Sequence, residues 1–166
     1  MKKLLQISVV LLLFFSLLSF VACQDADDNN DEELKEVVLL IVDKEHNELA
    51  RYERESSGYL SDLLLSLTQE EDSAFSYDST VSAYGQFVNS ITVETDPETF
   101  APIGLFPDSS ENEFVALYHT IDTVKERDYS YDFEFNDKTY YGAANNVDKT
   151  PLVDGAEYLF TISTWS

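Results

Sequence analysis

The sequence predicts an α+β domain in which one main helix packs against a mostly antiparallel sheet. Most apolar residues fall in short runs rich in β-branched and aromatic residues, separated by turn-forming residues, as is typical of strands. One segment, residues 59–67, spaces its leucines along one face of a helix. Hydrophobic residues make up 44% and aromatic residues 13% of the 166 residues, which is enough for a packed core.

The first 22 residues have the form of a cleaved signal peptide. Residues 1–3 carry two lysines, and residues 4–21 are apolar with four polar interruptions. A run of this length also approaches that of a membrane-spanning anchor. Its end, Phe20-Val21-Ala22-Cys23, resembles the lipobox of bacterial lipoproteins, in which the cysteine receives a lipid. We therefore expect a lipoprotein signal peptide over 1–22, ahead of the alternatives of a plain anchor or a soluble secreted form.

An acidic tether, residues 23–34, is expected after the signal peptide. Six of the ten residues from 24 to 33 are acidic, so the segment repels itself and offers little apolar surface to bury. Cys23 is the single cysteine of the chain, which leaves no internal disulfide. The sequence thus predicts lipidation at Cys23 and a location on the outer face of the cell membrane.

The charge balance excludes one class of partner. Ten lysines and arginines stand against 32 aspartates and glutamates, for a formal net charge of −22. Nucleic-acid binding requires a basic surface, so nucleic acid is not expected as a partner. The simplest interpretation of the acidity is solubility, and attraction of cations or of a basic partner is the alternative.

The predicted domain, residues 35–166, begins with strands and the helix. Residues 37–42 are a β-branched run, and residues 49–54 complete a hairpin after a polar turn. Residues 56–58 offer an N-cap to the helix over 59–67. A short strand over 75–77 follows.

The second half of the domain is predicted to contain three single strands and one hairpin. Residues 87–93 form one strand, and residues 96–110, with three of the four prolines, are expected to be irregular. Residues 113–119 form a further strand, along which successive side chains lie on alternate faces. Residues 129–141 form a hairpin turned at Asn136-Asp137, and residues 157–163 form the closing strand.

The order of motifs resembles the transcobalamin-like C-terminal domain of bacterial surface lipoproteins, over most of residues 36–164. The residues that carry the resemblance are the leucine-rich helix 59–67, Phe75-Ser76-Tyr77-Asp78, the stretch from Tyr84 to Ile91, Tyr141-Gly142-Ala143-Ala144 and the late segment from Pro151 to Tyr158. The central strand from Glu113 to Tyr118 lacks the tryptophan that is usual there. The resemblance implies a β-grasp-like fold.

The resemblance also implies a function. Its vertebrate members help to bury cobalamin, so a capture protein for a corrinoid or another bulky small molecule is expected, with an uptake transporter component as its implied partner. Aromatic rings and closely approached backbone suit such a ligand. The candidate ligand-binding residues are Tyr77, Tyr84, Gly85, Phe87, Tyr118, Tyr141 and Gly142. Core packing of the aromatic residues and turn formation by the glycines are the alternatives.

Catalysis is not expected, and neither is a resident cofactor or metal. The sequence contains no nucleophile motif such as Gly-x-Ser-x-Gly for which either histidine, His46 or His119, could act as the base. With one lipidated cysteine they are too few for a zinc site. The remaining alternative to ligand capture is a cell-surface interaction or adhesion module without a small-molecule ligand.

Overall fold

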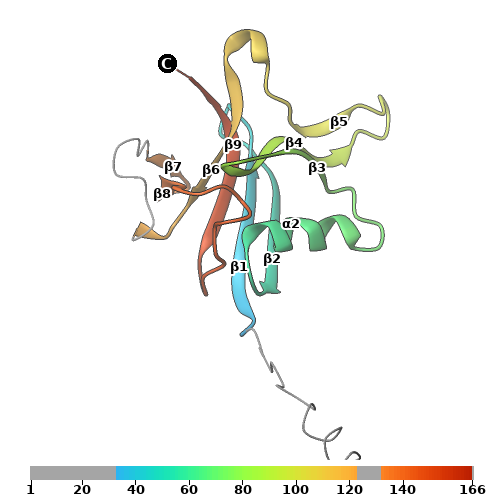
Figure 1. The fold of residues 1–166 in the computed structure, drawn as a ribbon. Helices are drawn as coiled ribbons and strands as arrows, with labels where there is room; N and C mark the ends of the chain where they lie inside the picture. The colour runs from blue at the N-terminus through green and yellow to red at the C-terminus, as the bar shows by residue number, and fades with distance from the viewer. Residues whose placement is uncertain (1–32, 123–131, 166) are drawn as a thin grey trace, which may run out of the picture. The chain divides into compact units, whose positions relative to one another are not determined.

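The computed structural model describes residues 33–122 and 132–165, which form two β-sheets, one α-helix and one short 3-10 helix (Figure 1). In chain order the elements are β1 (Lys35–Val42), β2 (Glu48–Ser56), α2 (Leu60–Gln69), β3 (Ser76–Ser82), β4 (Gly85–Thr95), β5 (Pro102–Leu105), η1 (Ser109–Glu111), β6 (Glu113–His119), β7 (Phe133–Phe135), β8 (Lys138–Gly142) and β9 (Glu157–Thr164). The predicted signal peptide, Cys23 and the tether as far as residue 32 lie outside the described residues.

The larger sheet has six strands in the order β2-β1-β9-β6-β8-β7. β1 and β9 run parallel, and every other neighbouring pair is antiparallel. A first hairpin, a helix after it and a last strand that returns parallel to the first are the arrangement of a β-grasp fold (Figure 1). The predicted α+β fold, with a mostly antiparallel sheet and one main helix, is confirmed.

A second sheet contains three antiparallel strands in the order β3-β4-β5. Its long central strand, β4, crosses the larger sheet near β6, as Figure 1 shows. The two sheets therefore meet at β4 and β6, and this junction forms the candidate site described below.

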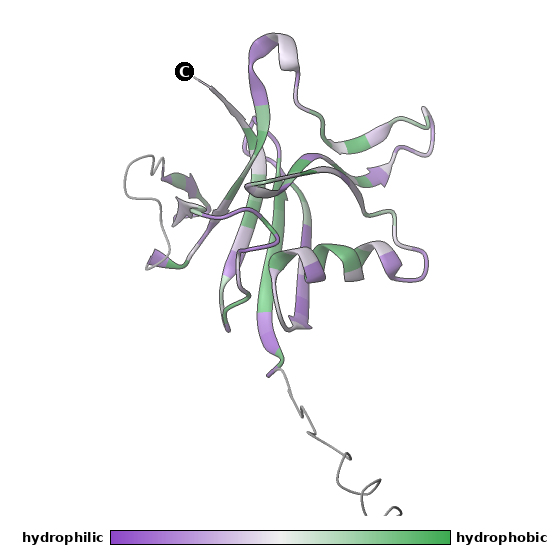
Figure 2. Ribbon diagram, viewed as in Figure 1, coloured by the Kyte–Doolittle hydropathy of each residue, from purple (hydrophilic) through white to green (hydrophobic). Residues whose placement is uncertain are grey.

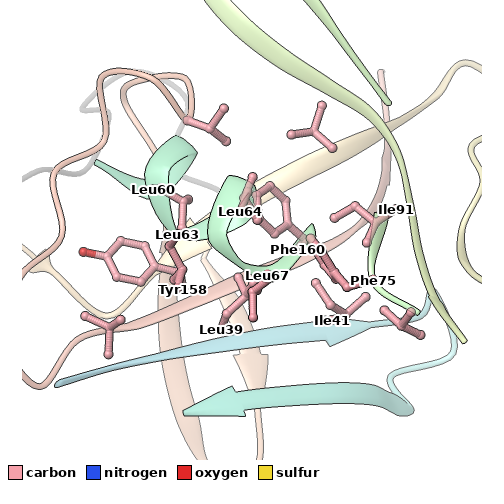
Figure 3. Packing of buried hydrophobic residues seen from close by; sticks show 14 of the residues in the cluster. Leu39, Ile41, Leu60, Leu63, Leu64, Leu67, Phe75, Ile91, Tyr158 and Phe160 are labelled. Carbon is pink, nitrogen blue, oxygen red and sulfur yellow. The ribbon is translucent and has the colours of Figure 1, made fainter. Parts of the chain in front are cut away.

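The main core lies between α2 and the larger sheet. The buried side chains of the helix are spaced three and four residues apart, so they share one face. They pack against β1, β9 and the segment before β3 (Figure 3), and burial of each leucine stabilises the fold by about 1.5–3 kcal/mol. The labelled members of this cluster are Leu39, Ile41, Leu60, Leu63, Leu64, Leu67, Phe75, Ile91, Tyr158 and Phe160.

A second cluster covers the other face of the larger sheet. Its buried members are Leu40, Val42, Ala116, Tyr118, Phe135, Tyr140 and Leu159. Because β1 contributes to both clusters, its sequence from residue 37 to residue 42 is apolar without interruption rather than alternating. Figure 2 shows this as a long hydrophobic stretch in β1, whereas the neighbouring β2 carries more hydrophilic residues.

The start of α2 differs from the sequence prediction. The N-cap is Tyr59, not a residue of 56–58, and the Asp62 carboxylate accepts a hydrogen bond from the Tyr59 amide at 2.8 Å. The amides of Leu60 and Ser61 donate to the carbonyls of Thr150 and Val147. The first turn of the helix is thus tied to a loop that also lines the candidate site.

The structure contains more strand than the sequence predicts in two places. The segment predicted as irregular, residues 96–110, contains β5, which begins at Pro102 on the edge of the small sheet, where proline is tolerated. β3 extends to Ser82, well beyond the short strand predicted over 75–77. In the predicted hairpin over 129–141, the part from 129 to 131 lies outside the described residues, and β7 and β8 form the rest.

Candidate functional site

A cleft of about 440 Å³ lies where the start of β4 faces β6 and the end of β9. This volume falls within the range of small-molecule pockets in proteins. Its lining residues come from β4 (Gln86, Phe87, Val88), β6 (Phe114, Val115, Ala116, Leu117, Tyr118), the end of β8 and the loop after it (Gly142, Ala143, Asn145, Asn146, Val147), and the β9 region (Phe160, Ser163, Thr164, Trp165).

Aromatic rings form much of the wall of this cleft. The rings of Phe114 and Trp165 are stacked, with centroids 4.1 Å apart and planes 20° apart. Trp165 is 69% exposed and Phe87 45% exposed, so both present apolar surface to solvent. Tyr118 is buried beside them, and burial raises the pKa of its hydroxyl, which keeps it uncharged. Large exposed rings around a concave surface are typical of a binding site.

The polar residues of the lining are neutral. Gln86, Asn145, Asn146, Ser163 and Thr164 line the cleft, and within residues 33–122 and 132–165 no charged residue does. Gln86 donates to the Ser79 hydroxyl at 2.9 Å, and Asn146 donates to the Tyr84 carbonyl at 3.0 Å. In a chain with a net charge of −22, an uncharged cleft favours an uncharged ligand.

Gly85 holds one wall of the cleft in place without lining it. Its φ angle is +126°, and a Cβ there would lie 2.6 Å from an Asp148 carboxylate oxygen. That oxygen accepts a hydrogen bond from the backbone N–H of Gln86 at 2.8 Å, and the Lys149 ammonium group donates to the Tyr84 carbonyl at 2.9 Å. These contacts fix the β3–β4 turn to the loop after β8, so the role of Gly85 is to allow this close approach.

The structure brings three of the seven predicted ligand-binding residues together. Phe87, Tyr118 and Gly142 line the cleft. Tyr77 packs instead against the main core beside Phe75, with ring centroids 6.4 Å apart. Tyr84 is 79% exposed at the tip of the β3–β4 turn, outside the cleft lining.

Tyr141 also lies outside the cleft lining, although its neighbour Gly142 belongs to it. It is half-buried in β8, where its backbone pairs with His119 of β6. Of the predicted tyrosines, Tyr118 alone therefore lies in the cleft.

Sequence reasoning missed Phe114 and Trp165 as site residues. Phe114 lies on the predicted strand 113–119, whose alternation indicates core packing as readily as a site. Trp165 follows the last strand, and the register that pairs Glu113 with Thr164 places it beside Phe114. The one feature of the sequence that could have indicated Trp165 as a site residue is that it is the sole tryptophan.

His119 is buried and makes contacts that stabilise the fold. It is 1% exposed, its Nδ1 accepts a hydrogen bond from the Ile121 amide at 3.3 Å, and its ring contacts that of Tyr158 edge-on. Burial lowers the pKa of the imidazole below its usual value, so the ring is neutral. Because His119 does not line the cleft, it offers no acid or base to a ligand there.

Neither a cluster of metal-ligating side chains nor a membrane-spanning helix is present in the described part of the chain. Within residues 33–122 and 132–165, no group of three or more histidines, cysteines, aspartates and glutamates is placed to hold a metal ion. Over the same residues, no helix is both long and apolar enough to cross a membrane.

The fold resembles that of a solved structure from Ruminococcus gnavus, described as a "putative metal binding protein". The TM-score is 0.50 at 16% sequence identity, and the alignment covers 80% of this chain and 99% of the other. At this identity the likeness shows the fold alone. No protein-family model matches the chain. No curated protein matches it either.

Proposed function

We propose that this chain is a lipid-anchored extracellular protein that captures an uncharged small molecule in the cleft between β4 and β6. The observation that carries the proposal is a concave site of about 440 Å³ with exposed aromatic rings and, among the residues that the structure describes, no charged residue in its lining. Such a site holds a ligand by apolar contact and ring stacking, and its side-chain amides orient the ligand.

A corrinoid such as cobalamin is the first ligand class to test. The resemblance to the transcobalamin-like C-terminal domain supports this choice, and the β-grasp arrangement agrees with it. The tryptophan usual in the central strand of that family is absent from β6. Trp165, which follows β9, stacks on Phe114 of β6 and places an indole ring at the cleft from a different part of the chain.

The size of the cleft bears on the partner. A corrinoid is larger than the drug-sized molecules that a cleft of this volume encloses. The cleft would therefore cover one part of the ligand and leave the rest accessible. A capture protein of this kind passes its ligand to another component, and an uptake transporter is the partner that we propose.

Isothermal titration calorimetry of the purified full-length chain with cobalamin tests the ligand. We expect a saturable heat of binding that is strongly reduced by Phe87→Ala, because this side chain is partly exposed and lines the cleft. Phe100→Ala is the matched control, since Phe100 is 80% exposed and does not line the cleft. Absence of heat with every cobalamin and corrinoid tried would reject this ligand class.

Lipidation of Cys23 is the proposed means of anchoring. The mature protein would then begin at Cys23 and carry its domain on an acidic tether. Cys23→Ala should release the folded protein from the membrane fraction, which cell fractionation with an immunoblot detects. If the variant stayed fully in the membrane fraction, a membrane-spanning anchor would replace the lipid.

A further inference from the structure

Strand β6 has an open edge inside the cleft. On one side, all of β6 from Glu113 to His119 pairs with β9. On the other side, β8 pairs with Tyr118 and His119 only. β8 ends at Gly142, so the first part of β6 has no neighbouring strand on that side among the described residues.

The backbone groups on this open edge can be identified from their neighbours. The Ala143 amide donates to the Leu117 carbonyl at 3.0 Å, and the Glu113 amide donates to the Asp108 carbonyl at 3.2 Å, both on the side away from β9. Alternate residues of a strand direct their backbone groups to the same side. The N–H and C=O of Val115, midway between Glu113 and Leu117, therefore lie on the open edge.

Val115 has no hydrogen-bond partner for these groups within residues 33–122 and 132–165. It is nevertheless partly buried and lines the cleft. Backbone donors and acceptors that are shielded from water without partners destabilise a protein, and an unpaired strand edge is a template for another strand.

Apolar side chains lie on both faces of the sheet beside this edge. Phe114 belongs with the cluster on one face, and Trp165 stacks on it. On the other face, Val147 and Phe160 belong to the main core and also line the cleft. A strand added in line with β8 would direct alternate side chains to these two surfaces.

We propose that the open edge of β6 binds an extended, uncharged peptide segment as an added strand, with hydrogen bonds to the N–H and C=O of Val115. Strand addition draws its affinity from backbone hydrogen bonds and its specificity from pockets for alternate side chains. The peptide is uncharged because no charged residue of the described part of the chain lines the cleft. This inference goes beyond the capture of a small molecule and does not depend on it.

The test uses the full-length chain and a set of capped octapeptides in which threonine alternates with valine, leucine, tyrosine or phenylalanine. Each peptide is matched by two copies, one N-methylated at the odd-numbered amides and one at the even-numbered amides, which keep the side chains and remove the N–H donors along one edge of the peptide strand. We expect calorimetry to show binding by at least one peptide and a loss of about tenfold or more on methylation in one of the two possible registers. Equal affinity of a peptide and both methylated copies would overturn the proposal, as would no binding by any peptide at millimolar concentration.

Variants of Val115 give the complementary measurement. Val115→Pro removes the open N–H at an edge position that tolerates proline, whereas Val115→Ala removes side-chain bulk and keeps the N–H. Peptide affinity should fall about tenfold further with proline than with alanine. Equal losses would overturn the proposal. If Val115→Pro fails to fold, the methylated peptides still decide the question.

Amide hydrogen exchange measured by NMR locates the added strand. In the free chain the Val115 amide should exchange much faster than that of Ala116, which pairs with Thr161 of β9, and saturating peptide should slow it. A Val115 amide already protected in the free chain would show that the edge is occupied and would overturn the proposal. Cobalamin binding without peptide binding rejects this inference alone, and the reverse result rejects only the proposed ligand.

Discussion

Trp165 exposes a large apolar ring in the lining of the cleft. Its ring stacks on Phe114, and the residue is 69% exposed, so most of its surface is accessible to solvent or to a ligand. We expect Trp165→Ala to weaken ligand binding about tenfold, because one ring stacked on a ligand is worth on the order of 1 kcal/mol beyond its buried area. Calorimetry measures the affinity, and thermal unfolding should show little change. Unaltered affinity would remove Trp165 from the site.

His119 makes stability depend on pH. Burial lowers the pKa of its imidazole in the folded chain, whereas the unfolded chain has the ordinary histidine pKa of about 6.5. Below that pH the unfolded state binds the proton more readily, so the free energy of unfolding falls as the pH drops from about 6.5 toward the folded pKa.

Urea unfolding at several pH values measures this contribution. His119→Gln should flatten the part of the profile between about pH 6.5 and 5, where carboxylates with ordinary or lowered pKa values remain ionised. The variant chain should be less stable overall, since His119 is 1% exposed. A profile with the same slope in both proteins would contradict the assignment.

Gly85 should tolerate substitution poorly. Alanine there would adopt a φ of +126° and place its Cβ 2.6 Å from an Asp148 oxygen, so we expect Gly85→Ala to destabilise the fold by about 1–3 kcal/mol. Gly155→Ala is the matched control: its φ is +71°, and a Cβ there would have no neighbour within 4 Å. Equal losses in denaturant unfolding would mean that the contact with Asp148 contributes nothing.

At the scale of elements, α2 stabilises the fold through one face. Leu64 is fully buried, whereas its neighbour Leu65 is 50% exposed. Leu64→Ala should lower the free energy of unfolding by about 2–5 kcal/mol, because it leaves a cavity in the main core. Leu65→Ala should cost less than about 1 kcal/mol. Similar losses in chemical denaturation would contradict the observed packing.

The elements that the sequence predicted well are those with a strong local pattern. The leucines of residues 59–67 and the β-branched run of residues 37–42 are recognisable without knowledge of their partners. β5 was missed because its first residue is proline and its apolar residues are few, so its pairing with β4 determines that it is a strand. Local patterns report burial, whereas short edge strands depend on their neighbours.

The candidate site was predicted only in part, for a related reason. Phe87 and Tyr118 lie on strands that could be recognised, and the cleft forms where those strands meet. Tyr77 and Tyr84 belong to the same motifs, but one faces the core and the other faces solvent. The face on which each ring lies depends on the register and crossing of the two sheets, which the local sequence does not encode.

At the scale of the whole molecule, distant segments build the cleft. β1 pairs with β9 across more than 100 residues, and the register of β6 with β9 brings Phe114 beside Trp165. No disulfide can hold these segments, since Cys23 is the sole cysteine. The cleft therefore depends on the packing of both sheets, and a ligand held there should raise the melting temperature by mass action.

The fluorescence lifetime of Trp165 tests the central claim most directly. Trp165 is the only tryptophan in the chain and lines the cleft, so its signal reports this site alone. A lifetime, unlike an intensity, is insensitive to absorption of light by free corrinoid. Titration of the full-length chain with cobalamin should shorten the lifetime in a saturable way, at the concentrations that give the heat of binding. An unchanged lifetime at saturating ligand would place any binding outside the cleft and contradict the proposed function.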